Sequence, residues 1–79
     1  MRLDKYLKVS RLIKRRTIAN EACDHGRVLV NGKPVRASYG GKVGDQIEIQ
    51  LGARVTAVEV LHITEHAQKD EASAMYREL

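Results

Sequence analysis

The residues that carry most catalytic and metal-binding chemistry are few in this chain and are poorly spaced to act together. None of the three histidines, His25, His62 and His66, has the spacing of an H-E-x-x-H or Cys/His zinc site. Cys23 lies two residues before His25, and on one helix this spacing points the two side chains about 200° apart. The Asp and Glu residues form no evident acid/base pair along the sequence. We therefore expect no catalytic residue, no metal site and no cofactor.

The one group of chemically similar residues that stands out is the lysines and arginines, which are concentrated in the first half of the chain. Residues 1–36 contain ten Lys and Arg against three Asp and Glu, a net charge of +7, and residues 37–79 contain four against seven, a net charge of −3. The formal charge of the whole chain is +4. Such polarity is typical of a protein that turns one half toward a polyanion.

The basic residues of the first half predict a phosphate-binding surface. If the first helix continues past residue 9, Lys8, Arg11 and Arg15 recur at i, i+3 and i+7 along one face. The other basic residues beside this stripe are Arg2, Lys5 and Arg16. The entry to a second helix follows directly, and its free N–H groups would also attract phosphate. A charged face that only meets solvent is the alternative, but residues 5–20 contain no acid to relieve the repulsion among these charges.

Structured RNA is the polyanion that the sequence favours. A surface of Arg and Lys suits recognition by shape and phosphate position, and three tyrosines are the only aromatic residues available for stacking on single strands. A DNA-binding regulator built on the first two helices is the alternative. Its second helix would offer mainly Asn20 and Glu21 for reading base edges.

Two helices must position these basic residues, because the first 25 residues contain neither glycine nor proline. Leu3 and Leu7 are four residues apart and predict a short amphipathic helix over residues 3–9. On that helix Asp4 and Lys8 have the spacing of an ion pair.

The second helix is predicted to begin after an N-cap at Thr17 and to run to His25. The residues of its buried face are predicted to be Ile18, Ala22 and Cys23. Gly26 then stands where a left-handed residue ends a helix without steric cost.

After residue 26 the pattern changes from helical to alternating. Asn31 and Gly32, between two short apolar segments, predict a β-hairpin with a type I′ turn. A second turn at residues 43–45 leads into a strand over residues 46–51. The residues predicted to share one side of this strand are Ile47, Ile49 and Leu51.

The last two elements are predicted from weaker patterns. Residues 54–63 are rich in β-branched residues, but their alternation changes phase, which a bulge or burial on both faces would explain. A terminal helix over residues 68–78 is predicted from an i, i+3, i+4, i+7 series, namely Ala72, Met75, Tyr76 and Leu79.

Length and composition place these elements in one domain. A chain of 79 residues has room for one core and little interior for a deep pocket. No apolar run approaches the ~20 residues of a membrane span, and the single cysteine excludes an internal disulfide. We therefore expect an α+β protein in the cytoplasm.

Four segments carry a family resemblance: residues 2–7 (RLDKYL), the Arg16-Thr17 helix entry, residues 26–35 (GRVLVNGKPV) and residues 43–47 (VGDQI). The combination of G-R-V-x-V-N-G-K with a following V-G-D turn is specific. On these motifs the chain resembles the alpha-L (S-four) RNA-binding domain family.

The resemblance implies an α+β fold in which two short N-terminal helices pack on a small, mainly antiparallel twisted sheet, with RNA on the helical side. It implies an RNA-binding domain over residues 1–63 and a C-terminal tail or short helix over residues 64–79. The RNA contacts that it implies are Arg2, Lys5, Lys8, Arg11, Arg15, Arg16, Thr17 and Arg27. Asp4 would orient a neighbouring Arg or Lys without touching RNA itself.

The short length and the ending at residues 69–76 resemble a stand-alone bacterial member of the family that works in ribosome-associated quality control. Such a member binds rRNA and P-site tRNA on large ribosomal subunits obstructed by peptidyl-tRNA, and it assists the factor RqcH in adding alanine to the stalled chain. The implied protein is not an enzyme. Its implied partners are large-subunit rRNA, peptidyl-tRNA and RqcH, and it is expected to bind no membrane and to act as a monomer.

Two alternatives remain open from the sequence. A related heat-shock protein of the family also binds obstructed large subunits, although it is expected to be longer and to end in a basic extension, whereas this sequence ends acidic. The other alternative is a guide module that acts in trans for an RNA-modifying enzyme, because the same domain is often fused to pseudouridine synthases.

Overall fold

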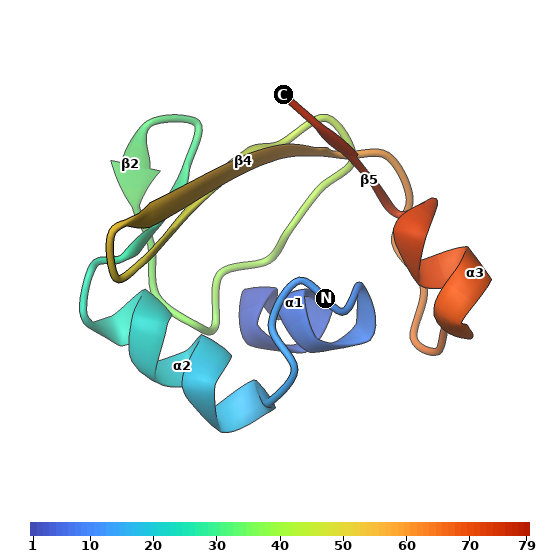
Figure 1. Cartoon of the computed structure of the whole chain (residues 1–79), viewed down its shortest axis with the longest axis horizontal. Coiled ribbons are helices and arrows are strands. Elements are labelled where there is room, and N and C mark those ends of the chain that lie inside the picture. Colours follow the sequence, from blue (N-terminus) through green and yellow to red (C-terminus); the bar gives the residue numbers. More distant parts are fainter.

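Two helices pack against one face of an antiparallel sheet in the computed structural model, which describes residues 1–79 (Figure 1). In chain order the elements are α1 (Leu3–Val9), α2 (Arg16–Asp24), β1 (Val28–Val30), β2 (Lys33–Pro34), β3 (Gln46–Leu51), β4 (Arg54–Val60), α3 (Lys69–Ser73) and β5 (Tyr76–Glu78). The strands are hydrogen-bonded in the order β2-β1-β3-β4-β5, and every pair is antiparallel. The predicted α+β arrangement is confirmed. None of the three helices combines the length and apolar character needed to span a membrane.

The core lies between the sheet and the first two helices. Ile47 and Ile49 are buried and alternate with exposed polar residues, as in a strand with one covered face. Leu3 and Leu7 face them from α1 at the i, i+4 spacing, and both are fully buried. Burial of each such side chain stabilises the fold by roughly 1.5–3 kcal/mol.

Tyr6 connects this core to the C-terminal segment. Its hydroxyl donates a hydrogen bond to the carbonyl of Met75 at 2.8 Å, and its side chain is buried. Burial, with a smaller contribution from Tyr76, raises the pKa of Tyr6 to about 12. The phenol is therefore a neutral structural group.

The predicted stripe of Lys8, Arg11 and Arg15 is wrong, because α1 ends before Arg11. Arg11 adopts a positive φ of 65°, and the N–H of buried Ile13 donates a hydrogen bond to the carbonyl of Leu7 at 3.1 Å. Burial of Ile13 thus turns the chain back toward the core. The three basic residues lie on α1, in the following turn, and at the N-cap of α2.

Helix α2 begins two residues earlier than predicted. Arg15 is the N-cap in an extended conformation, and Thr17 lies inside the first turn. The helix ends at Asp24, and Gly26 has a φ of 73°, as its position in the sequence predicts.

The buried face of α2 contains Ala22 and Cys23 as predicted, but Ala19 takes the place predicted for Ile18. Ala19, Ala22 and Cys23 are buried at the i, i+3, i+4 spacing, whereas Ile18 is 44% exposed. Burial, followed by the charges of Asp4 and Asp24, raises the pKa of Cys23 to about 11. Its thiol is therefore a protonated core group at neutral pH.

The predicted hairpin turn joins β1 to β2. Asn31 and Gly32 both have positive φ, 52° and 84°, which is the type I′ requirement. The Asn31 side chain also donates to the carboxylate of Asp45 at 3.2 Å and accepts from the N–H of Gln46 at 3.0 Å. The turn is thereby fixed to the start of β3.

We expect Gly32→Val to lower the free energy of unfolding by about 1 to 2 kcal/mol, because a β-branched residue resists the left-handed region. A Cβ at residue 32 would meet no atom within 4 Å, so the cost is backbone strain and not collision. Gly40→Ala is the matched control, since residue 40 is equally open but has no positive φ. Urea unfolding followed by circular dichroism measures both variants, and an equal loss in the two would contradict the explanation.

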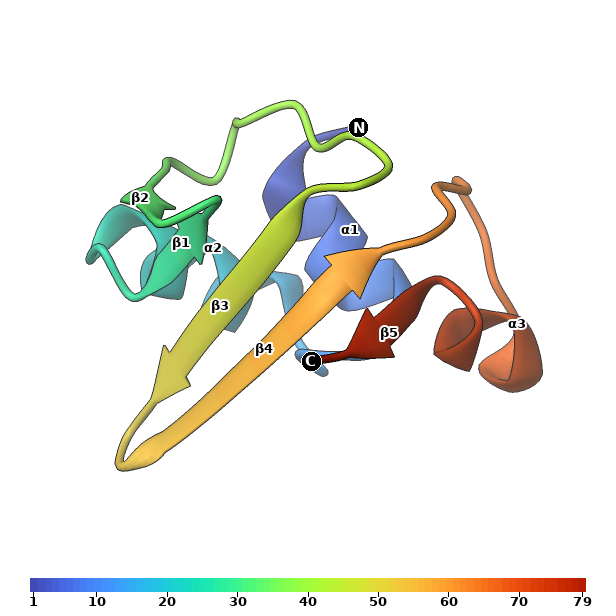
Figure 2. The same cartoon turned by 90° about the horizontal axis from the view of Figure 1, so that it is seen from above.

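Strand β4 contains no bulge and is not buried on both faces, so both predicted explanations of its pattern are wrong. It stays in unbroken register with β3 from Arg54 to Glu59. Val58 and Val60 are buried, but Val55 is 59% exposed, and Leu51 at the end of β3, which pairs with Arg54, is 39% exposed. The pattern changes because the β3–β4 hairpin extends beyond the helices (Figure 2).

The predicted helix over residues 68–78 is wrong after residue 73. Helix α3 covers only five residues, and residues 76–78 form β5 along the edge of β4. Ala72 and Met75 are buried where the two elements meet. Without β5, the backbone groups of β4 along this edge would lack partners, and strand pairing outweighs the helical periodicity.

Candidate nucleic-acid interface

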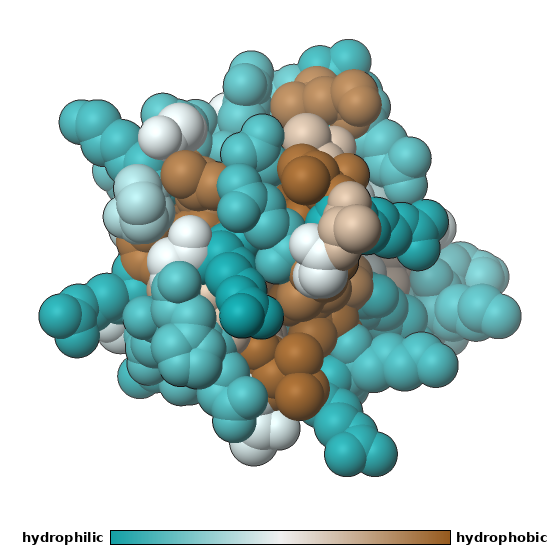
Figure 3. Space-filling view, turned by 60° about the vertical axis from the view of Figure 1, so that its left-hand side comes forward, coloured by the Kyte–Doolittle hydropathy of each residue, from teal (hydrophilic) through white to brown (hydrophobic).

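The side of the molecule that carries α2 and β2 is mostly hydrophilic, with smaller apolar areas between the polar side chains (Figure 3). Arg15, Arg16 and Thr17 are all exposed at the start of α2. A surface of this kind suits charged ligands better than apolar ones.

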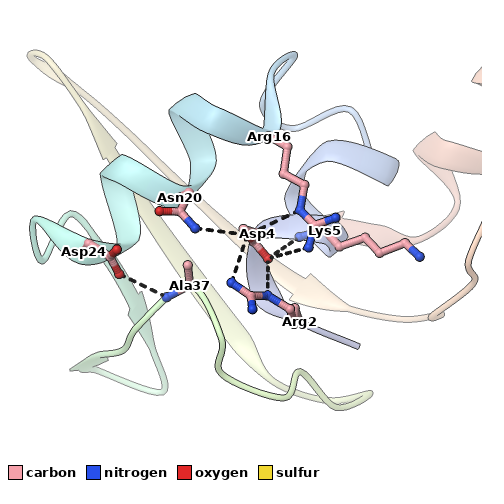
Figure 4. A network of polar contacts seen from close by, with 7 residues as sticks. All are labelled: Arg2, Asp4, Lys5, Arg16, Asn20, Asp24 and Ala37. Atoms are coloured by element: carbon pink, nitrogen blue, oxygen red, sulfur yellow. Dashed lines mark hydrogen bonds and ion pairs between the residues drawn. The ribbon is translucent and has the colours of Figure 1, made fainter.

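A buried carboxylate gathers donors from both N-terminal helices (Figure 4). Asp4 is 2% exposed. Arg2 Nε donates to Oδ1 at 3.1 Å, and Arg16 Nε lies 3.3 Å from Oδ2. Asn20 Nδ2 donates to Oδ2 at 3.2 Å, and the backbone N–H of Lys5 donates to Oδ1 at 2.8 Å. One carboxylate therefore holds two arginines whose side chains remain 51% and 47% exposed.

The charge of Asp4 depends on these partners. Burial raises the pKa of Asp4, but the hydrogen bonds from Arg2, Asn20 and Arg16 together outweigh burial and lower the pKa to about 2. The predicted ion pair with Lys8 is absent, because Asp4 turns inward to its arginine partners while Lys8 is exposed. Asp4 is thus a fixed negative charge covered by two positive ones.

The loop between β2 and β3 fixes the position of Asp4. The carbonyls of Tyr39 and Ala37 accept hydrogen bonds from the N–H groups of Leu3 and Asp4, at 2.8 and 3.2 Å. The Tyr39 hydroxyl in turn donates to buried Asp45 at 3.0 Å, and this hydrogen bond raises the pKa of Tyr39. Each free N–H at the start of α1 thereby has a partner, and the carboxylate is held against α2.

A hollow of about 320 Å³ lies beside this cluster, along the side of the first turns of α2. The residues that line it are Asp4, Arg16, Thr17, Asn20 and Glu21. No side chain caps α2, so the N–H groups of its first turn are available to a ligand. The partial positive charge of the helix end adds to that of Arg16. This arrangement can hold a phosphate group.

A second hollow, of about 210 Å³, lies at the other end of α1. Lys8 and Arg11 line it together with Val9 and residues 65–67. Lys5 lies on the same helix, but its ammonium group extends away from Asp4 and pairs with Glu65. The basic residues of α1 and its following turn therefore surround a site separate from the Asp4 cluster.

Arg27 is a predicted RNA contact that lines neither of these two hollows. It follows α2 at the end opposite Arg16, about 14 Å along the axis for a helix of this length. Its carbonyl accepts a hydrogen bond from the N–H of Gln50 at 2.8 Å, which places it beside the end of β3. Its role in RNA binding stays a prediction, as do those of the remaining residues.

Asn20 belongs to the cluster, although its place on the second helix had suggested only a role in reading bases. It lies one helical turn after Arg16, so an i, i+4 pair on α2 faces one carboxylate on α1. That spacing is visible in the sequence. Its partner is not, because Asp4 comes from a different helix.

The model of the S4 domain family matches residues 1–47, more than half of the chain. The chain belongs to the S4 domain family. The resemblance predicted from the sequence motifs is confirmed, and the Asp4 cluster and the entry to α2 both lie inside the matched residues.

Relatives of this S4 domain protein match it along nearly its whole length. A protein of Halalkalibacterium halodurans named RQC P-site tRNA stabilizing factor is 50% identical over 76 residues, which are 96% of this chain and 86% of that protein. A protein of the same name from Streptococcus pneumoniae is 51% identical with the same coverage. The chain therefore shares a family with these factors.

A solved structure has the same fold. A trimeric structure of Heat Shock Protein 15 from Vibrio cholerae matches with a TM-score of 0.92 and 30% sequence identity. The match covers all of this chain and 81% of that one. The arrangement of helices and strands is therefore shared beyond the residues matched by the family model.

Proposed function

We propose that this S4 domain protein is a non-catalytic RNA-binding factor of ribosome-associated quality control. It binds rRNA and the P-site tRNA on obstructed large ribosomal subunits, and it assists RqcH in the alanine tailing of stalled nascent chains. The observation that carries the proposal is the pair of half-exposed arginines that Asp4 holds beside the uncapped N-terminus of α2.

The mechanism is the positioning of positive charge for phosphate groups. A guanidinium presents a planar fork of N–H donors that matches two phosphate oxygens. Asp4 fixes the forks of Arg2 and Arg16 before RNA arrives, so less side-chain freedom is lost on binding. The cluster keeps a net positive charge, because two guanidinium groups face one carboxylate. Asp4 is therefore a positioning residue.

Two regions outside the Asp4 cluster extend the phosphate-binding surface. The first turn of α2 supplies backbone N–H groups and the exposed residues Arg15 and Thr17. The second hollow supplies Lys8 and Arg11. Contacts at both places would hold a folded RNA by its shape, and this favours a factor that keeps tRNA in place between additions of alanine.

The names of the relatives support this reading, since each is called an RQC P-site tRNA stabilizing factor. In the proposal, residues 1–63 form the RNA-binding domain and residues 64–79 are a C-terminal segment, whose strand β5 pairs with β4 and whose Met75 lies in the core. The chain acts as a monomer on the ribosome. The second candidate function is ribosome rescue of the heat-shock type, which the 0.92 TM-score to Heat Shock Protein 15 favours.

Cosedimentation tests the proposal. The purified protein is mixed with small subunits, large subunits, intact ribosomes, and large subunits carrying peptidyl-tRNA, with and without RqcH. We expect selective retention on the tRNA-bearing large subunit and faster alanine addition by RqcH. Equal binding to all four particles would contradict the proposal, and retention without any effect on alanine addition would favour the heat-shock type of rescue.

Salt dependence measures how many phosphates are contacted. If about five are neutralised, the plot of log K against log salt should have a slope near −3.5, taking ~0.7 per contact as a lower guide. The measurement is a binding isotherm on tRNA-bearing large subunits at four potassium concentrations and constant magnesium. A slope near zero would exclude phosphate contacts as the basis of binding.

A further inference from the structure

The sheet has a second face that no helix covers (Figure 2). One line of residues crosses it from edge to edge. The register pairs Pro34 with Leu29, Leu29 with Glu48, and Glu48 with Ala57, and the N–H of Leu79 donates to the carbonyl of Ala57 at 2.9 Å. We call these five residues the outer row. Strands are about 4.8 Å apart, so the row is about 19 Å long.

The outer row faces away from the core by the alternation of its strands. The residues on either side of Leu29 and Glu48 in their strands are buried under the helices, namely Val28, Val30, Ile47 and Ile49. Ala57 precedes buried Val58 in the same way. Leu79 is 58% exposed. Four apolar side chains are thus left at the surface with one carboxylate at their centre.

The half of the outer row that runs from Glu48 to Leu79 is hollowed. A depression of about 230 Å³ is lined by Glu48, Ala57 and Leu79, with Gly32, Gln46 and Ile47 forming the rest of its wall. Glu48 makes no ion pair, in contrast to Glu59 on the next strand, which pairs with Arg77. The depression therefore combines apolar walls with an unpaired negative charge.

This chemistry fits a cation carried by an apolar segment. When apolar groups exclude water around a charge pair, the attraction is stronger than between exposed charges. RNA is disfavoured, because the one charge of the outer row is negative. We propose that the outer row binds a protein segment that places a lysine or arginine on Glu48 and packs apolar neighbours on Leu29, Ala57 and Leu79. This goes beyond the proposed function and does not depend on it.

The test uses two synthetic peptides and the full chain labelled with ¹⁵N. The peptide Ac-Leu-Arg-Leu-NH₂ is expected to shift the amide signals of Glu48, Ala57 and Leu79, and Ac-Leu-Glu-Leu-NH₂ is expected to leave them unchanged. Glu48→Gln should weaken the arginine peptide at least fivefold, and Glu48→Lys should abolish the shifts. Glu71→Gln, which removes an exposed acid on α3, is the matched control and should bind as the unaltered chain does.

Four results would overturn the proposal. The first is an equal loss in Glu71→Gln, which would make the effect one of net charge. The second is a set of shifts confined to α1 and α2. The third is a concentration-dependent dimer in sedimentation with shifts on the outer row, since a second copy would then be the occupant. The fourth is a tenfold rise in the RNA affinity of Glu48→Lys, which the proposal expects to be unchanged, since RNA would then be the ligand of this face. The peptide titration contains no RNA, so its outcome is independent of the proposed function.

Discussion

Arg16→Gln is expected to weaken binding to large ribosomal subunits that carry peptidyl-tRNA by about 10- to 100-fold. A hydrogen bond to a charged group contributes about 1.5 to 3 kcal/mol, and every 1.4 kcal/mol is a factor of ten in affinity. Glutamine keeps a hydrogen-bonding end but loses the charge and the planar fork that Asp4 now positions. Dissociation constants measured at one fixed salt concentration give the change directly.

The control for this variant is Arg54→Gln, which makes the same change in charge at the exposed end of the β3–β4 hairpin. It should bind as the unaltered chain does, and an equal loss in both variants would show that only total charge matters. Glutamate at residue 16 would be a poorer choice, because a second carboxylate would lie beside Asp4 and disturb folding. Circular dichroism checks that Arg16→Gln keeps its fold, since Arg2, Asn20 and the Lys5 N–H still bind Asp4.

The sequence was most informative where a residue type decides the conformation by itself. Asn31 and Gly32 predicted the hairpin because few other residues adopt positive φ in succession, and both do so here. Ile47 and Ile49 predicted a strand with one covered face because their alternation matches the pleat. These features depend on neighbours in the chain.

Predictions failed where a partner distant in sequence decides the outcome. Arg11 takes a positive φ because Ile13 is buried, and nothing in the basic pattern reveals that burial. The apolar residues around 76–78 have helical spacing, but residues 76–78 form a strand because they pair with the free edge of β4. The candidate site follows the same rule. Arg2, Arg16 and Asn20 meet because two helices cross at Asp4, and the spacing of basic residues cannot show a carboxylate at their centre.

Asp4 links the stability of the fold to the geometry of the site. Its carboxylate is one of few buried charged groups, and the residues that hold it are those proposed to hold RNA. A change at Asp4 should therefore appear in two measurements that are otherwise independent. The first is the pH dependence of unfolding and the second is RNA affinity.

Asp4→Asn is expected to lower the free energy of unfolding by about 2 kcal/mol at pH 7. The pKa of Asp4 is about 2 in the folded chain against an ordinary 3.8, and this difference corresponds to about 2 kcal/mol. Because the folded pKa is the lower one, the stabilisation is complete above about pH 4 and is lost as the pH falls toward 2. The gap between the two proteins in urea unfolding should therefore close over that range. Asp70→Asn removes an exposed acid of α3 and should leave the curve unchanged.

RNA affinity of the same variant separates two explanations of the site. Asp4→Asn adds one unit of positive charge to the cluster, so attraction by charge alone predicts tighter binding and a steeper salt dependence. If Asp4 acts by positioning the arginines, the variant should bind RNA more weakly. Arg2 and Arg16 then lose the acceptor that fixes them, and the RNA itself must order their side chains. We expect binding to weaken by about tenfold at pH 7 and 25 °C, under conditions where circular dichroism shows the variant folded. Tighter binding would mean that Asp4 serves stability and that the surface holds RNA through its charge.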